Sequence, residues 1–219
     1  MSPPRGFFVT GTGTDVGKRV VADVIARAAA ERGERVRVFK PAVSGLDDGG
    51  ESDHALLRRA AGSPQSDEEI APYRYGPPVS PHLGAEMEDE EIDPQRLLAT
   101  AAAAREGSSF FVCEGVGGIL VPLAPGYLIR NLAADLALPL VIVAPPGLGT
   151  INHTLLTIEA AWTAELDIHA VVLNRWPKRP TKVQRSNRET IAELGGVEVL
   201  TLPKIDLEDM DGWPDLGLL

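Results

Sequence analysis

Short runs of apolar, β-favouring residues alternate along the chain with longer stretches whose apolar residues recur at helical spacing. The short runs, each predicted as a buried strand, lie at residues 7–10, 36–39, 110–113, 140–144, 170–173 and 197–200. The stretches predicted as helices lie at residues 17–32, 52–61, 94–105, 151–165 and 182–194. This alternation predicts a mostly parallel sheet with helices on both faces, and it places ligands beyond the carboxyl ends of the strands.

The first predicted helix carries two distinct sets of side chains. Its apolar stripe consists of Val20, Val21, Val24, Ile25 and Ala28. Asp23, Arg27 and Glu31 recur at four-residue spacing on another face, where neighbouring side chains can pair. The pattern therefore predicts a helix that packs one face on the sheet.

The 219 residues are enough for one sizeable core, and we expect a single α/β domain over residues 1–219. The stretch 62–93 is rich in Pro, Glu and Asp, and we expect it to follow an irregular path. The acidic tail, 206–219, has apolar ends, and its sequence is compatible with docking or with fraying.

Charge and cysteine content narrow the class of protein. The net charge of −10 disfavours nucleic acid or an anionic membrane as the partner, because either would favour a basic surface. The single cysteine excludes an intramolecular disulfide and fits a reducing cytoplasm. No apolar run reaches the roughly 18 residues of a membrane span.

A glycine-rich segment, Gly11-Thr12-Gly13-Thr14-Asp15-Val16-Gly17-Lys18, follows the first predicted strand and opens the first predicted helix. Small residues there let backbone N–H groups converge on phosphate oxygens, and the helix N-terminus favours negative charge. We therefore predict a phosphate-binding loop (P-loop). Its predicted nucleotide contacts are Thr14, Asp15, Val16, Gly17, Lys18, Arg19 and Val20. The G-x-G-x-x-x-G spacing is one residue too long for a dinucleotide-binding turn.

Charged residues stand at the ends of the next predicted strands. Lys40 follows the second strand, where a lysine can neutralise a transferring phosphoryl group. Ser44, four residues later, could bind a substrate oxygen. Glu114 ends the third core strand and precedes glycines, and Asp53 opens a predicted helix. Two carboxylates with phosphate oxygens and water are enough for Mg²⁺, so Asp53 and Glu114 are the predicted metal ligands.

The P-loop departs from the common G-x-x-x-x-G-K-[ST] pattern at two positions. Thr12 replaces a glycine, and Arg19 replaces the Ser or Thr whose hydroxyl normally binds Mg²⁺. Arginine has no acceptor atom and cannot ligate a metal. We expect the Arg19 side chain to extend into solvent, with Asp53, Glu114, phosphate oxygens and water completing the metal's coordination. The alternative is that its guanidinium reaches a phosphate and replaces part of the metal's charge.

Several of these segments occur in one combination. They are Phe8 to Lys18, Phe39-Lys40-Pro41 with Ser44-Gly45, Ser52-Asp53, Pro78 to His82, Glu114 to Gly118, Leu148-Gly149-Thr150-Ile151-Asn152-His153-Thr154, Asn174 and Leu202-Pro203-Lys204. The combination, which spans nearly the whole chain, resembles dethiobiotin synthetase. The resemblance implies a P-loop ligase that converts 7,8-diaminononanoate, CO₂ and ATP to dethiobiotin, ADP and phosphate, through a carbamate and a carbamic-phosphoric anhydride.

The resemblance also implies roles for individual residues. Lys18 and Lys40 would place charge on the phosphates and the carbamate, and Asp53 and Glu114 would hold Mg²⁺. The nucleotide would further contact Gly115, Val116, Gly117, Asn174, Arg175, Leu202, Pro203 and Lys204, the last five around adenine. The diamine would contact Thr14, Ser44, Gly117 and Gly118. Leu148 and Asn152 would lie near the interface of a homodimer and reach the neighbouring subunit's substrate.

Other classes of P-loop protein fit the residues less well. A dimeric ATPase switch of the MinD/ParA type carries a signature lysine where this chain has Gly13. A GTPase is expected to carry an N-K-x-D motif that recognises guanine, whereas the corresponding strand here ends in Asn174-Arg175-Trp176-Pro177. An amidotransferase synthetase of the cobyrinate type would need a glutaminase domain, for which we expect no room. The MinD/ParA-like switch is the principal alternative.

Overall fold

The computed structural model describes residues 5–49 and 51–219. Six strands form the main sheet: β1 (Arg5–Gly11), β2 (Val36–Phe39), β3 (Phe110–Glu114), β6 (Leu140–Ala144), β7 (Ile168–Trp176) and β8 (Val199–Pro203). They lie in the order β2-β3-β1-β6-β7-β8, and every neighbouring pair is parallel. A separate antiparallel hairpin joins β4 (Pro122–Ala124) to β5 (Tyr127–Leu128).

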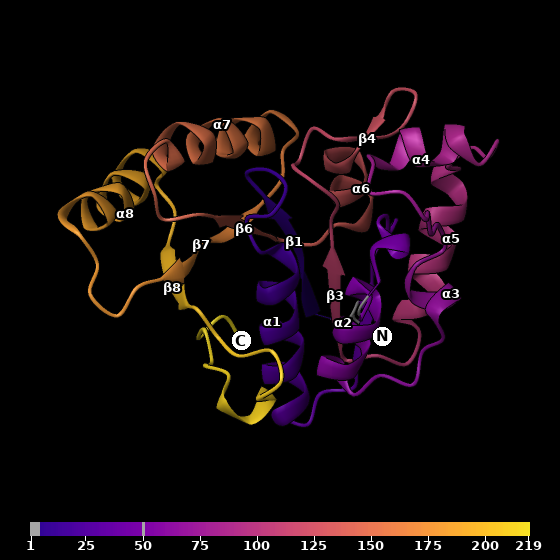
Figure 1. Cartoon of the computed structure of the whole chain (residues 1–219), viewed down its shortest axis with the longest axis horizontal. Helices are drawn as coiled ribbons and strands as arrows, with labels where there is room; N and C mark the ends of the chain where they lie inside the picture. The colour runs from indigo at the N-terminus through magenta and orange to yellow at the C-terminus, as the bar shows by residue number, and fades with distance from the viewer. Residues whose placement is uncertain (1–4, 50) are drawn as a thin grey trace.

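Helices cover both faces of the sheet (Figure 1). The longer helices are α1 (Lys18–Glu31), α2 (Asp53–Ala61), α5 (Pro94–Arg105), α6 (Ile129–Leu136), α7 (Thr150–Thr163) and α8 (Lys182–Gly195). The short ones are α3 (Asp67–Ile70), α4 (Pro81–Met87) and the 3₁₀ turns η1 (Leu46–Asp48) and η2 (Met210–Gly212). This arrangement confirms the predicted α/β fold with a mostly parallel sheet.

Alternation along the central strand divides the core in two. Phe8 of β1 packs in the cluster that includes residues of α5, α6, α7 and α8. Phe7 and Val9 point to the other face and pack in the cluster that includes residues of α1 and α2. Because successive side chains of a strand point to opposite faces, a strand covered on both sides reads as a continuous apolar run.

The stretch 62–93 is more regular than we expected, because it contains α3 and α4. Helix α3 begins with a capping box in which Ser66 and Glu69 satisfy each other's backbone N–H groups. Pro81 stands in the first turn of α4, where its missing N–H costs nothing. Both helices are too short to produce a helical period in the sequence. Helix α6 and the β4–β5 hairpin were likewise not predicted.

The acidic tail docks against α1, which resolves the choice that the sequence left open. Its side chains Asp211 and Asp215 form ion pairs with Arg27 and Arg32 at 2.8 and 2.6 Å. Leu218 is buried with the α1-side core. Figure 1 shows this yellow segment running beside α1. The tail is therefore a part of the domain's packing.

Across residues 5–49 and 51–219, no helix has both the length and the hydropathy needed to span a bilayer.

Candidate active site

The phosphate loop joins β1 to α1 at the carboxyl edge of the sheet. Gly17 precedes the helix with a φ of 94°, a left-handed conformation that favours glycine. A Cβ atom at this position would lie 1.9 Å from Nδ2 of Asn174, so the close approach also requires glycine. Asn174 Nδ2 donates a 3.0 Å hydrogen bond to the carbonyl of Val16. The end of β7 thus contacts the predicted phosphate loop directly.

Lys18 begins α1 and folds back over the loop that precedes it. Its Nζ donates a 2.9 Å hydrogen bond to the carbonyl of Gly13, and the side chain is buried. Burial lowers the pKa of Lys18, and the nearby carboxylate of Glu114 opposes that change. The ammonium group is therefore held at the loop, where an incoming phosphate would replace its backbone partner.

Lys40 lies at the centre of a cluster of charges beside the loop. It follows β2 directly, and its Nζ contacts Oε1 of Glu114 at 2.7 Å and Oδ2 of Asp53 at 3.3 Å. Glu114 ends β3, which lies between β2 and β1 in the sheet, and Asp53 opens α2. Lys40 and Glu114 thus meet at the carboxyl ends of two neighbouring parallel strands, and Asp53 joins them from the start of α2.

Burial and pairing with opposite charges shift the pKa values of this cluster in opposite directions. Burial lowers the pKa of Lys40, but the carboxylates of Glu114 and Asp53 outweigh it and raise the pKa. Burial raises the pKa of Glu114, and Lys40 offsets only part of this. Burial also raises the pKa of Asp53, but Lys40 and Arg19 outweigh it, so that pKa is lowered. Lys40 thus compensates part of the charge of Glu114, and Lys40 and Arg19 together compensate the charge of Asp53.

The two carboxylates fit a Mg²⁺ site in chemistry and in position. Asp53 and Glu114 contact the same ammonium, so an oxygen of each lies within 3.3 Å of one point. Oε2 of Glu114 is buried and has no hydrogen-bond partner among the described residues. Within residues 5–49 and 51–219, no cluster of three or more His, Cys, Asp and Glu side chains is arranged to hold a metal. Phosphate oxygens and water would therefore have to complete the coordination.

Arg19 does not extend into solvent, contrary to our expectation. Its Nη1 donates a 3.0 Å hydrogen bond to Oδ1 of Asp53, and its side chain is only 30% exposed. The reason is that α2 packs against α1 and brings Asp53 within reach of the first helical turn. The residue that replaces a metal-binding hydroxyl thus pairs with a predicted metal ligand.

Asp23, which the sequence pattern grouped with Arg27 and Glu31, is a buried acid. Of the three residues spaced four apart on α1, Arg27 and Glu31 form an ion pair at 2.7 Å, whereas Asp23 is completely buried. Neither of its carboxylate oxygens has a hydrogen-bond partner among the described residues. Burial raises the pKa of Asp23 well above its usual value, and Glu114 adds to the effect. The carboxylate of Asp53 also raises the pKa of Asp23, whereas the positive charges of Arg19 and Lys40 lower it.

Comparison with known proteins decides the family. A family model described as an AAA domain matches residues 5–208. A protein of Bacillus subtilis (strain 168) named ATP-dependent dethiobiotin synthetase BioD is 37% identical over 203 residues, which are 92% of this chain and 88% of the relative. A protein of Anaeromyxobacter dehalogenans (strain 2CP-C) with the same name is 41% identical over 198 residues, which are 90% of this chain and 89% of the relative. The chain belongs to the ATP-dependent dethiobiotin synthetases. Members of this family are ligases.

Solved structures with a similar fold are more distant. The septum site-determining protein MinD of Pyrococcus horikoshii OT3, complexed with Mg-ADP, aligns with a TM-score of 0.55 and 16% identity, over 98% of this chain and 88% of that one. The cell division ATPase MinD of Pyrococcus furiosus aligns with a TM-score of 0.56 and 16% identity, over 92% and 84%. At this identity the likeness shows the P-loop NTPase fold alone.

A cavity of about 180 Å³ lies beside the phosphate loop of this dethiobiotin synthetase. It is lined by Gly11, Thr12, Gly118, Ile119, Leu120, His153, Leu156, Thr157 and Ala160. A Cβ atom on Gly118 would lie 3.4 Å from the carbonyl of Gly11, so the glycine-rich turn after β3 packs closely on the P-loop. His153 lies on the cavity wall with Leu156, Thr157 and Ala160 of α7.

The residues predicted around adenine lie at the ends of two neighbouring strands. Asn174 of β7 pairs in register with Leu202 of β8, and Pro203 and Lys204 follow on the surface. Arg175 is exposed and has a left-handed backbone, with a φ of 58°. The structure therefore gathers this predicted set at one edge, beside the phosphate loop.

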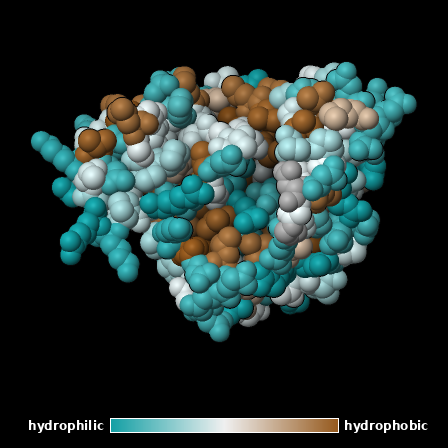
Figure 2. Space-filling view, in the orientation of Figure 1, coloured by the Kyte–Doolittle hydropathy of each residue, from teal (hydrophilic) through white to brown (hydrophobic). Residues whose placement is uncertain are grey.

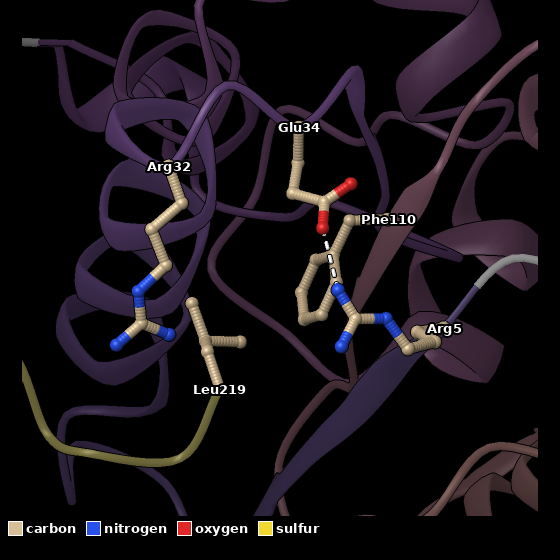
Figure 3. Close-up of a pocket in the computed structure, with 5 residues that line it drawn as sticks. All are labelled: Arg5, Arg32, Glu34, Phe110 and Leu219. Carbon is tan, nitrogen blue, oxygen red and sulfur yellow. Dashed lines mark hydrogen bonds and ion pairs between the residues drawn. The ribbon is translucent and has the colours of Figure 1, made fainter.

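A second cavity of about 210 Å³ lies away from this dethiobiotin synthetase site. It is lined by Arg5, Arg32, Glu34, Phe110 and Leu219 (Figure 3). Arg5 and Phe110 begin β1 and β3, so this cavity is at the amino ends of the strands, and Arg5 pairs with Glu34 across it. Its position at the opposite edge of the sheet separates it from the phosphate loop.

Proposed function

We propose that the chain forms the ureido ring of dethiobiotin from 7,8-diaminononanoate, CO₂ and ATP. One amine takes up CO₂ as a carbamate. A carbamate oxygen then attacks the γ-phosphorus of ATP, and ADP leaves. The second amine attacks the carbonyl carbon of the resulting carbamic-phosphoric anhydride, and phosphate leaves as the ring closes. The relatives named as ATP-dependent dethiobiotin synthetases support this proposal.

The observation that carries the proposal is the buried ammonium of Lys40 beside the P-loop. Negative charge moves between a carbamate, a phosphoryl group and a leaving phosphate in this reaction, so the protein mainly has to supply fixed positive charge. Lys18 would bind the β- and γ-phosphates, and Lys40 would face the transferring group. Burial strengthens both interactions because water screens them less.

The carboxylates of Asp53 and Glu114 would hold Mg²⁺ together with phosphate oxygens and water. Bound there, Mg²⁺ would neutralise part of the phosphate charge. Lys40 contacts both carboxylates at 3.3 and 2.7 Å, so its ammonium would lie next to that charge. The same set of residues thus serves the metal and the transferred group.

Two further groups of residues are proposed to bind the substrates. Thr14, Ser44, Gly117 and Gly118 would contact the diamine near the phosphate loop, and Gly118 already packs on that loop. Asn174, Arg175, Leu202, Pro203 and Lys204 would surround the adenine. Residues 14–20, together with Gly115, Val116 and Gly117, would make the other contacts to the nucleotide.

We also propose that the enzyme is a homodimer that uses the surface around α7. Leu148, which precedes this helix, is 96% exposed, and Leu156 on the helix is 55% exposed. Figure 2 shows apolar residues gathered along the upper edge of the molecule, where Figure 1 places α7. Asn152 is exposed on the same helix, and a partner seated there would bring Leu148 and Asn152 to the neighbouring cavity.

An activity assay tests the proposed reaction. With Mg²⁺, ATP and bicarbonate, the protein should convert 7,8-diaminononanoate to dethiobiotin, detected by mass spectrometry, with one ADP formed per product. Omitting the diamine or the bicarbonate should abolish ATP consumption. Steady ATP hydrolysis that ignores the diamine, with no ureido product, would show instead an ATPase of the switch type.

A further inference from the structure

Arg19 occupies a carboxylate that the metal would need. Its guanidinium holds Oδ1 of Asp53 at 3.0 Å, while the ammonium of Lys40 holds Oδ2 at 3.3 Å. Under the proposed function, Asp53 has to offer an oxygen to Mg²⁺. A guanidinium fixed beside that oxygen would compete for it and would repel the metal. Arg19 therefore needs another partner once a metal nucleotide is bound.

Asp23 is the acid that helical spacing places next to Arg19 on α1. It follows Arg19 by four residues on α1, so the two side chains share one side of the helix. Helical side chains lean toward the helix N-terminus, which directs the carboxylate of Asp23 toward the turn that carries Arg19. The charge of Arg19 already acts on Asp23.

The environment of Asp23 favours the arrival of a cation. The side chain is completely buried, and neither carboxylate oxygen has a partner among the described residues. A buried polar group without a hydrogen bond destabilises the fold. A guanidinium beside it would offset that cost and would supply two or more N–H donors.

We propose that Arg19 exchanges Asp53 for Asp23 when a Mg²⁺ nucleotide binds, so that Asp23 is the positioning residue that frees Asp53 for the metal. The inference rests on the Mg²⁺- and ATP-dependent function proposed above. It explains how a P-loop can carry arginine where a metal-binding hydroxyl is expected, because Asp23 offers the arginine a second ion-pair partner.

The test is a double-mutant cycle on nucleotide binding. Binding of a non-hydrolysable ATP analogue is measured by calorimetry at increasing Mg²⁺ concentration, without diamine or bicarbonate. Asp23→Asn should raise the Mg²⁺ concentration for half-maximal binding about 5- to 10-fold, since neighbouring residues that act together couple to this degree. In the Arg19→Thr background, Asp23→Asn should change the Mg²⁺ concentration for half-maximal binding by less than about twofold.

Two controls separate this effect from damage to the fold. Asp23→Ala should behave as Asp23→Asn does, because both remove the carboxyl group that would receive Arg19. Asp167→Asn removes an exposed carboxylate on the α7–β7 connection and should leave the Mg²⁺ requirement unchanged. Melting temperatures without nucleotide confirm that each variant is folded.

The remaining outcomes overturn the proposal. An equal rise in the Mg²⁺ requirement in both backgrounds would mean that Asp23 acts on the metal without Arg19. No rise in either background would mean that Asp23 has no part in metal binding, and Mg²⁺-independent binding by the unsubstituted protein would remove the reason for the exchange. Because the measurement needs no turnover, a protein that forms no dethiobiotin can still show the coupling, so the two proposals fail separately.

Discussion

Removing the buried ammonium of Lys40 should destabilise the protein more than the loss of any surface charge. In Lys40→Gln a neutral amide replaces the cation that contacts Glu114 at 2.7 Å and Asp53 at 3.3 Å. Glu114 is buried with the ammonium, so its carboxylate would remain in a low-dielectric environment with no cation in contact with it and with Lys18 as the remaining nearby cation. Asp53 keeps Arg19 as a second partner.

The size of the effect follows from the burial of each contact. Breaking a buried ion pair by removing one partner costs about 3–5 kcal/mol, which applies to the contact with Glu114. The side chain of Asp53 is 41% exposed, so water screens that contact and its loss adds at most about 1 kcal/mol. For a domain of this size each kcal/mol lowers Tm by roughly 2–4 °C, so a total loss of about 3–6 kcal/mol should lower Tm by roughly 6–24 °C.

Thermal and urea denaturation of the nucleotide-free protein measure this change. Lys178→Gln is the matched control, because Lys178 is exposed and should be replaceable at little cost. Adding Glu114→Gln to Lys40→Gln should recover most of the lost stability, since two facing amides need no compensating charge.

Two results would refute this reasoning. If Lys40→Gln melted at the same temperature as Lys178→Gln, the contact with Glu114 would contribute nothing net. If the double variant were no more stable than Lys40→Gln, the loss would come from packing and not from an uncompensated carboxylate.

Four further outcomes are expected. Lys40→Gln should lower kcat by about 10²–10³-fold with a smaller effect on ATP affinity, as for other electrostatic donors; a kcat within about twofold of the parent, far short of that loss, would make Lys40 a structural residue. Arg19→Thr should lower the Mg²⁺ concentration for half-maximal activity, because it adds a hydroxyl ligand and releases Asp53; an equal or higher requirement would contradict the missing-ligand account. Because the pKa of Asp23 is raised in the folded state, its contribution to stability is complete below the unfolded value of 3.8 and is lost as pH rises toward the folded pKa. Urea denaturation should therefore show the stability of Asp23→Asn relative to the parent increasing as the pH rises above 3.8, by up to about 1.4 kcal/mol per pH unit, and a flat difference would contradict the raised pKa. Leu156→Asp should weaken a dimer in sedimentation experiments, whereas Leu194→Asp on α8, similarly exposed at 62% against 55%, should not; equal effects would place the interface elsewhere.

Features that depend on neighbours in the sequence were determined by the sequence itself. The predicted strand 36–39 and helix 94–105 coincide with β2 and α5, because their apolar period and flanking turn residues act locally. The phosphate loop follows from its glycines and from its place between a strand and a helix. Lys40 and Glu114 could be assigned to one site because the carboxyl ends of parallel strands meet at one edge.

The helices within 62–93 needed the tertiary structure. Helix α4 has buried residues Pro81, Gly84 and Ala85, and Gly84 lies against Tyr75, so this short helix is held by packing. A segment of one or two turns is marginal by itself, and its sequence carries too few residues to show a period. The docking of the tail likewise depends on Arg27 and Arg32 from a helix at the other end of the chain.

The partner of Arg19 and the burial of Asp23 were decided only by tertiary structure. Asp53 is 34 residues from Arg19 and reaches it because α2 packs on α1. Helical spacing indicates which side chains share a face, but it does not say which face a second helix and the end of β3 will enclose. A charged side chain therefore has a sequence-determined position on its helix, while its partner, its burial and its pKa depend on elements that approach from elsewhere in the chain.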